Sequence, residues 1–343
     1  MGENNFEIKV VLDKKVWEKF NLSLEDPSYF QSWDWGEVEK LKGVKVFRYG
    51  FYRNSKLEAI FQIFEIKAKR GHFLHIRQGP VILSWDKKTT KCIFDFIKEI
   101  AYKINVSYIR ISPLLSMDDP IVLYLKDLGF RQSPIHNVDA ENRWVLDIKP
   151  DKDFLLANMR KTTRYLIKKA QGMDIDITKS NRTEDMDEFL RIYNETALNK
   201  KFVPHSLILE EFEIFKKDNS AFVYLAKQDK NILSGALITY YGKEAIYRHG
   251  ATSIVGRNTP ASYLLQWKAI NDAKEMGLAK YNFWGIANTD NKKHPWFGLS
   301  QFKKGFGGYK VDFIHSMDLP IKLTYWISYL IDYCTKIKKG YNL

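Results

Sequence analysis

Two stretches of the chain repeat one succession of hydrophobic and polar positions. Alternating apolar residues predict strands, and apolar residues spaced by three or four predict helices. In the first stretch the pattern predicts strands at 46–52, 57–66 and 72–76, a helix at 91–104, a strand at 108–111 and a helix ending near Gly129. In the second stretch it predicts strands at 222–227, 232–240 and 245–250, a helix at 260–276 and a strand at 280–284.

This repeat indicates two copies of one α/β unit. The order of hairpin, strand, helix and strand resembles that of the GNAT N-acyltransferase fold. The expected fold class is therefore α/β (α+β), with tandem GNAT-like domains that each hold a mixed, mostly antiparallel sheet flanked by helices. Two unrelated α+β domains of similar rhythm are the alternative. Because a strand ends and a polar linker begins near Pro150, we expect a first domain at 1–148, completed by a C-terminal helix at 319–343, and a second at 149–318.

The net charge narrows the classes of partner. The chain of 343 residues has 54 Lys and Arg against 41 Asp and Glu, which gives a net charge of +13. Such a charge favours polyanions, such as tRNA, a nucleotide diphosphate or an anionic membrane face, although a lysine-rich surface can also serve solubility alone. A basic helix predicted at 159–170 carries Arg160, Lys161, Arg164 and Lys168, which either contact phosphate or form a solvated face.

Several other classes of protein are disfavoured by what the chain lacks. Cys92 and Cys334 lie far apart among apolar residues, so neither a disulfide framework nor a zinc site is expected. The sequence has no G-x-S-x-G, H-E-x-x-H or Walker motif, which disfavours hydrolases, metalloenzymes and nucleotidases. Residues 1–5 lack the basic and apolar regions of a secretory signal, and no apolar run reaches the ~18 residues of a spanning helix. We expect a cytoplasmic protein.

The run from Phe302 to Phe313 is the most informative for chemistry. It places Phe302, Lys303 and Lys304 before three glycines in four positions, which predicts a strand that bends or lets another backbone approach closely. A lysine at such a bend would face an anion such as phosphate or a developing oxyanion. Strand alternation would put only one of Lys303 and Lys304 in the cleft.

Coenzyme A is not expected to be the acyl carrier. In a GNAT-like unit the loop before the second predicted long helix would cradle the pyrophosphate with backbone N–H groups. Here it reads Gly256-Arg257-Asn258-Thr259-Pro260, without the glycine pattern of that fold, and Pro260 removes one donor. We therefore expect no cofactor, and the activated acyl group must come from another carrier.

The chain resembles the FemABX family, the aminoacyl-tRNA-dependent peptidyltransferases that build peptidoglycan bridges. The resemblance rests on motifs that follow one another in order along nearly the whole chain: Phe30-Gln31-Ser32 with Trp35, the basic helix at 159–170, Phe202-Val203-Pro204-His205-Ser206, His249-Gly250-Ala251-Thr252, Trp284-Gly285-Ile286, His294-Pro295-Trp296-Phe297-Gly298 and Phe302-Lys303-Lys304-Gly305-Phe306-Gly307-Gly308. The length is similar to that of compact members, which lack a long helical arm.

The resemblance implies a reaction. An amino acid passes from aminoacyl-tRNA to a side-chain amine of the stem peptide in a peptidoglycan precursor, either lipid II or UDP-MurNAc-pentapeptide. The second domain would take the tRNA and the first the precursor. Lys303 would stabilise the tetrahedral oxyanion, with Lys304 as its rival, and Phe302 would stack on the terminal adenine or support the lysine.

The resemblance also implies binding residues, with two departures. Trp35 and Lys40 would hold the acceptor precursor, the basic helix would meet tRNA or diphosphate, and His205 and His249 would line the acceptor cleft unless each is simply a hydrogen-bonded structural residue. Compact relatives have a phosphate-binding lysine where this chain has Glu39, beside Lys40. They also have a carboxylate, a proposed base, where this chain has Ser112.

The C-terminal tail at 319–339 predicts a helix that is apolar over more than one face and edged by lysines. It could pack on the first domain or dock at the inner membrane leaflet. We expect a monomer. Two other functions remain open, a coenzyme A-dependent GNAT N-acyltransferase and a non-catalytic tRNA-binding module.

Overall fold

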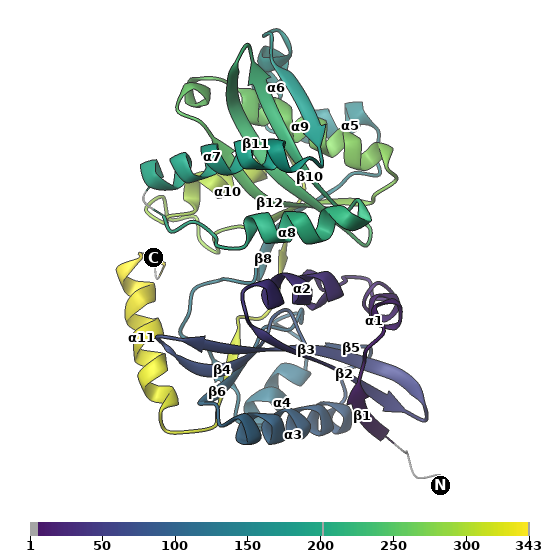
Figure 1. Ribbon diagram of the computed structural model, residues 1–343. Helices are drawn as coiled ribbons and strands as arrows, with labels where there is room; N and C mark the ends of the chain where they lie inside the picture. Colours follow the sequence, from purple (N-terminus) through teal and green to yellow (C-terminus); the bar gives the residue numbers. More distant parts are fainter. Residues whose placement is uncertain (1–5, 201, 342–343) are drawn as a thin grey trace. The chain divides into compact units, whose positions relative to one another are not determined.

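The structure, a computed structural model, describes residues 6–200 and 202–341 (Figure 1). The segment 1–5, assessed above for a secretory signal, lies outside the described residues. The chain forms two compact units. One holds the chain up to Asn142, the piece Lys293–Pro295 and the chain from Asp312 onward, and the other holds Arg143–Lys292 and Trp296–Val311.

The first unit is built on one sheet in which β4 and β6 are parallel and the other paired neighbours are antiparallel. In spatial order its strands are β1 (Phe6–Val10), β2 (Lys45–Arg53), β3 (Lys56–Ala68), β4 (Gly71–Ile76), β6 (Tyr108–Ile111), β15 (Met317–Pro320) and β7 (Arg131–Gln132), with β5 (Val81–Ile82) paired to β3. Its helices are α1 (Lys14–Asn21), α2 (Trp33–Leu41), α3 (Lys87–Ile104), α4 (Ile121–Asp127) and α11 (Tyr325–Lys338), with a 3₁₀ turn at Tyr29–Gln31.

The two faces of this first sheet pack differently because successive side chains of a strand point to opposite sides. Leu74 and Ile76 belong to the main core, with buried residues of α3 such as Ile93 and Phe94. Phe73 faces the other way and packs with Tyr108 and Tyr325 of α11. Figure 1 shows α3 and α4 over one face of the sheet and α1 and α2 over the other.

The second unit repeats this plan. In spatial order its strands are β14 (Tyr309–Asp312), β8 (Asn142–Asp147), β13 (Lys280–Gly285), β12 (Glu244–Thr252), β11 (Asn231–Tyr241), β10 (Ala221–Gln228) and β9 (Asp176–Ser180). Its helices are α5 (Lys152–Asn158), α6 (Lys161–Gln171), α7 (Thr183–Lys200), α8 (Ile208–Phe215), α9 (Ala261–Glu275) and α10 (Phe297–Lys304), with 3₁₀ turns at Lys216–Asp218 and Val255–Asn258. As β4 and β6 do in the first unit, β12 and β13 run parallel.

The predicted repeat of hairpin, strand, helix and strand is confirmed, but the units differ from the expected bounds at three places, one of which is the piece Lys293–Pro295 that belongs to the first unit. Strand β8 falls within the range expected for the first domain, yet it pairs with β13 in the second sheet. The chain returns to the first unit at Asp312 rather than after residue 318, because β15 pairs with β6. The described part of the chain has no helix with the length and apolar content needed to cross a bilayer.

The prediction of one strand from Phe302 to Phe313 is wrong. Phe302 and Lys303 lie in helix α10, and the strand begins only at Tyr309. Phe302 and Phe306 are four positions apart, a helical spacing, and their rings pack 5.3 Å apart by centroids. The close approach expected of the glycines does occur, since a Cβ on Gly308 would lie 2.2 Å from the Val145 carbonyl oxygen.

A buried ionic network ties the C-terminal segment to the first sheet. Arg110 on β6 donates from Nε and Nη2 to the two carboxylate oxygens of Asp318 on β15, at 2.7 and 2.9 Å. Its Nη2 also donates to Asp332 of α11 at 3.0 Å. All three side chains are almost wholly buried. A buried charge that loses its partner is costly, so the sheet depends on residues from the end of the chain.

Replacing Asp318 with alanine should therefore lower the free energy of unfolding by about 3–5 kcal/mol, because the Arg110 charge stays buried with one partner fewer. Urea denaturation monitored by circular dichroism would measure the loss. Asp95→Ala, which removes an exposed partner of Lys91 on α3, is the control and should leave the midpoint unchanged. A midpoint for Asp318→Ala equal to that of the control would contradict the expectation.

Candidate active site

The candidate site of the second unit lies where the parallel strands β12 and β13 stop pairing. Their register runs from Glu244 opposite Lys280 to Ile246 opposite Asn282, yet β12 continues to Thr252 and β13 to Gly285. On its other side β12 carries a β-bulge, because Leu237 and Ile238 pair with His249 and Tyr247 and leave Arg248 as the extra residue. Bulges of this kind redirect a side chain.

Lys303 of α10 places its ammonium between these two strand ends. Its Nζ donates to the Gly285 carbonyl oxygen at 2.6 Å and lies 5.8 Å from the centre of the Tyr247 ring. The residue is only 5% exposed. Burial lowers the pKa of Lys303 to about 7, and the nearby positive charge of Arg248 contributes. A buried lysine of this kind can stabilise a negative charge that appears beside it.

A buried carboxylate fixes the bulge. Glu211 of α8 accepts hydrogen bonds from Arg248 Nε and Nη2 at 2.6 and 3.2 Å, and its Oε2 lies 3.4 Å from His249 Nε2. Burial raises the pKa of the Glu211 carboxyl, but Arg248 and His249 outweigh that effect and hold it well below its usual range. Burial also lowers the pKa of His249. The site therefore holds an ionised Glu211, a charged Arg248 and a neutral His249 at neutral pH.

Trp284, near the end of β13, contacts Arg248 of β12. Its backbone is left-handed, with φ of 64°, and the Asn282 side chain accepts its amide hydrogen at 2.9 Å. The guanidinium of Arg248 lies 4.5 Å from the centre of the Trp284 ring, and that of Arg143 lies 5.1 Å away. A bulky residue keeps a positive φ only where its surroundings enforce it, which marks this strand end as a constrained position.

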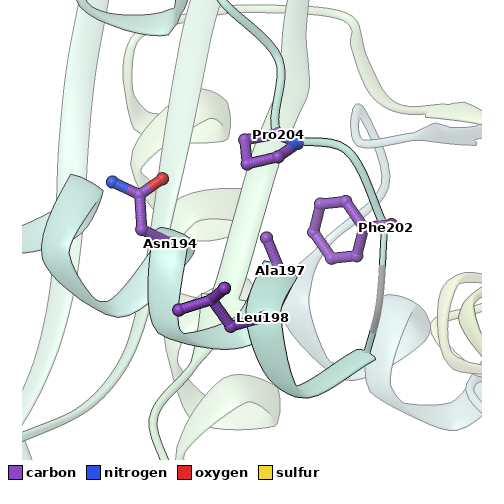
Figure 2. Close-up of a pocket in the computed structure, with 5 residues that line it drawn as sticks. All are labelled: Asn194, Ala197, Leu198, Phe202 and Pro204. Atoms are coloured by element: carbon purple, nitrogen blue, oxygen red, sulfur yellow. The ribbon is translucent and has the colours of Figure 1, made fainter.

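The two predicted histidines lie together. The rings of His205 and His249 have centroids 5.1 Å apart, and Tyr193 meets the His249 ring edge-on. Next to them is an apolar hollow of about 370 Å³, shown in Figure 2, lined by Asn194, Ala197, Leu198, Phe202 and Pro204. Lys303 is not among the residues that line this hollow.

The other two residues predicted on α10, Phe302 and Lys304, are less buried than Lys303. Phe302 is partly buried, packs against the core cluster of the second unit and meets Tyr263 edge-on at 5.0 Å. Lys304 pairs with the exposed Asp290 at 3.2 Å. The two lysines left open in the sequence differ in burial, since Lys303 is buried and the Lys304 side chain is 24% exposed.

The four predicted basic residues of helix α6 and its N-cap differ in exposure, and Arg164 is the least exposed of them. Arg164 donates from Nη1 to the carbonyl oxygens of Ala157 and Met159, at 2.7 and 2.6 Å, and so caps the end of α5. These contacts use Nη1 of Arg164, and its role in substrate binding stays a prediction. Arg160 reaches Gln301 at 3.1 Å, while Lys161 and Lys168 are exposed.

A second polar cluster lies in the first unit, past the ends of β4 and β6. Arg77 donates from Nε to Asp139 at 2.8 Å and from Nη1 to Glu39 at 3.3 Å. Ser112 donates to Asp139 at 2.6 Å, and His75 Nε2 lies 3.3 Å from it. Burial raises the pKa of Asp139, but Arg77, His75 and Ser112 outweigh it and hold that pKa far below its usual range.

Glu39 and Ser112, at which the resemblance implies departures from the compact relatives, both lie in this cluster. Glu39 is a partner of Arg77, and a lysine there would repel it. At the position of Ser112 the carboxylate is supplied by another segment of the chain, because the Ser112 hydroxyl donates to Asp139.

Trp35 and Lys40, the two residues of the first unit predicted to bind the acceptor precursor, differ in exposure. Trp35 is buried, with its ring 4.6 Å from that of Phe30, and its role in holding the acceptor precursor stays a prediction. Arg77 stacks over Phe30 at 3.6 Å. Lys40 is exposed and pairs with Glu37 at 2.9 Å.

The loop before α9 does not fit the pyrophosphate of coenzyme A. The amides of Ile254, Gly256 and Thr259 already donate to Glu195, Ser253 and the Gly256 carbonyl. A Cβ on Gly256 would lie 1.9 Å from the Leu233 carbonyl oxygen, so this glycine serves packing against β11. Among residues 6–200 and 202–341, no group of His, Cys, Asp and Glu could hold a metal ion.

Sequence reasoning missed Glu211, Arg248, Arg77 and Asp139. A signal existed for Glu211, since it shares the buried stripe of α8 with Ile208, Phe212 and Phe215. A charged residue at such a position needs a buried partner. No local pattern marks Asp139, whose partners come from distant segments.

The chain is similar to known proteins in sequence and in fold. Lipid II:glycine glycyltransferase of Staphylococcus aureus strain MRSA252 is 21% identical over 388 aligned positions, which cover 90% of this chain and 92% of that protein. The crystal structure of FemX superposes with a TM-score of 0.82 at 20% identity and covers 95% of this chain and 100% of that one. A tandem GNAT protein from the clavulanic acid biosynthesis pathway gives 0.59 at 11% identity, with coverage of 92% and 98%.

These likenesses confirm the tandem GNAT-like fold expected from the repeat. The family model of the FemAB family matches residues 12–226 and 208–332, which extend over most of the chain. The resemblance noted in the sequence is therefore confirmed: the protein is a transferase of the acyltransferase class, and it belongs to the FemAB family.

Proposed function

We propose that the protein transfers an amino acid from aminoacyl-tRNA to the side-chain amine of a stem peptide in a peptidoglycan precursor, with lipid II as the acceptor. The relative from Staphylococcus aureus is named for glycine transfer to lipid II, and it aligns over nearly all of both chains. The observation that carries the proposal is the buried Lys303 ammonium between the unpaired ends of β12 and β13.

The chemistry is aminolysis of an ester. The neutral acceptor amine attacks the ester carbonyl, the C–N bond forms, and a tetrahedral oxyanion appears. The C–O bond to the ribose then breaks, and the proton lost by nitrogen ends on the leaving ribose hydroxyl. Lys303 stabilises the oxyanion, and its near-complete burial strengthens that interaction because little water screens it.

The neighbouring residues position this lysine. Glu211 holds Arg248 in the bulge, and Arg248 stacks over Trp284, which precedes the carbonyl that Lys303 contacts. Phe302, one residue before Lys303, packs against the core and fixes the helix. In this proposal these groups act through Lys303 and need not touch the substrate.

Both substrates are polyanions, which suits the net charge of +13. Exposed Arg160, Lys161 and Lys168 supply charge for tRNA on the second unit, and Lys40 and the partly exposed Arg77 supply it for the precursor on the first. Coenzyme A is disfavoured as the donor, because the loop that would bind it has its amides engaged within the protein.

A transfer assay tests the proposal directly. The protein is mixed with aminoacyl-tRNAs that each carry one radiolabelled amino acid, glycine included, and with lipid II or UDP-MurNAc-pentapeptide as acceptor. We expect label to appear in a precursor only when the tRNA is charged. Transfer from acetyl-CoA instead, or binding of tRNA that ignores charging and yields no product, would refute the proposal and favour the other two functions.

Lys303→Ala should lower kcat by about 10²–10³, because one donor to the oxyanion is lost. Lys304→Ala on the same helix is the matched control. Its side chain pairs with an exposed aspartate, so kcat should change less than about threefold. Single-turnover transfer rates would measure both. Equal losses in the two variants would remove Lys303 from its proposed role.

The pH dependence should reveal the charge state of Lys303. The acceptor amine, with a pKa of about 10.4, becomes a better nucleophile as pH rises. Lys303 loses its proton through about pH 7, and the stabilising charge is lost with it. The two effects offset each other, so the rate should rise to about pH 7 and then level off.

Lys303→Arg provides the comparison, since arginine stays charged at every working pH. Its rate, though lower, should keep rising above pH 7. Initial rates corrected for spontaneous ester hydrolysis would show the difference. A wild-type rate that climbs more steeply through pH 7 would mean that Lys303 works as a base instead.

A further inference from the structure

Helix α11 buries polar side chains and exposes apolar ones, whereas an ordinary surface helix does the opposite. The side chains that it turns toward the first unit include Ser328 and Asp332, both buried. Asp332 accepts hydrogen bonds from Arg110 at 3.0 Å and Arg70 at 3.5 Å. Gly71 allows this close approach, because a Cβ there would lie 2.4 Å from Ser328 Oγ. The helix is thus attached through polar and ionic contacts together with the Tyr325 ring, which packs on Phe73 and Tyr108.

The opposite face of α11 is apolar and exposed. Ile327 is 62% exposed and Leu330 59%, and they lie at the centre of a continuous stripe. Its further members are Leu323, Trp326, Ile331, Tyr333, Cys334 and Ile337. We call these eight residues the outer stripe. A continuous apolar patch on a surface helix marks an interaction site, whereas single exposed apolar residues do not.

Charge around the outer stripe indicates which partner suits it. From Leu319 to Tyr341 the sequence has four lysines, at 322, 336, 338 and 339, and a single acid, Asp332, which is buried in its ion pairs. Arg131 adds a guanidinium 4.8 Å from the centre of the Trp326 ring. An apolar stripe with a cationic border and aromatic residues is typical of helices that lie in the interface of an anionic bilayer.

We propose that the outer stripe of α11 docks the protein on an anionic lipid bilayer. The helix would lie flat in the interface along its 14 residues, about 21 Å, with its apolar side chains among the acyl chains and its lysines near the headgroups. A second copy of the chain suits the stripe less well, because pairing would bring two sets of four lysines together without acids to offset them.

Docking of this kind deepens the proposed function. The docking itself does not rest on that function, but its consequence for catalysis does. A docked helix would hold the first unit at the surface in which a lipid-linked acceptor is anchored. The two alternatives for the C-terminal tail, packing and docking, are then both realised, one on each face of the same helix (Figure 1).

Co-sedimentation with vesicles tests the docking. The full chain is mixed with vesicles of phosphatidylglycerol and phosphatidylcholine, or of phosphatidylcholine alone. We expect binding to the anionic vesicles, weakened by salt, and at least tenfold weaker binding for the double variant Ile327→Ser/Leu330→Ser. Leu123→Ser on α4, where Leu123 is 65% exposed, is the matched control and should bind as wild type does. Circular dichroism checks that each variant is folded.

The outcomes separate docking from catalysis. No binding by the wild type, equal binding by the double variant, or self-association that the double variant abolishes would each overturn the docking proposal. If docking holds, the double variant should still transfer to soluble UDP-MurNAc-pentapeptide while losing at least tenfold in transfer to lipid II in vesicles. Vesicle binding without transfer to any acceptor would leave docking intact and refute the proposed function instead.

Discussion

A buried charge must have a partner, and in both units that constraint shapes the strand on which the candidate sites are built. Strand β12 presents Arg248 and His249 to Glu211, and the end of β4 presents Arg77 and His75 to Asp139. In each case an arginine and a histidine from the corresponding strand of the repeat share one buried carboxylate. The carboxylates come from unrelated segments, a helix in one unit and a loop in the other.

The repeated arrangement also shows how the two units differ. In the second unit a lysine is inserted from a helix at the end of the parallel pair, where Lys303 contacts the Gly285 carbonyl. In the first unit the corresponding strand ends are occupied by Ser112 and the Arg77 pairings. Two copies of one framework have thus acquired different polar contents, and the proposed function assigns the reacting ester to one unit and an anionic substrate to the other.

Much of this fold could be predicted from the pattern of apolar residues, because the strands and long helices of both units have strong periods. The segment around Lys303 could not. Its glycines favour a strand, and only the packing of Phe302 and Phe306 shows that the preceding residues are helical. Lys303 itself was found through a motif, whereas Glu211 and Asp139 required the tertiary structure, since burial and partners from distant segments give them their properties.

The path of the chain has a consequence for its synthesis. Arg110 and its partner Asp318 are 208 positions apart, and the whole second unit lies between them. At roughly 5–20 residues per second, a ribosome needs about 10–40 s to extend the chain from one to the other. During that interval the nascent first sheet has an arginine without its carboxylates and lacks strand β15 beside β6. The unit that is translated first is therefore the last to be completed.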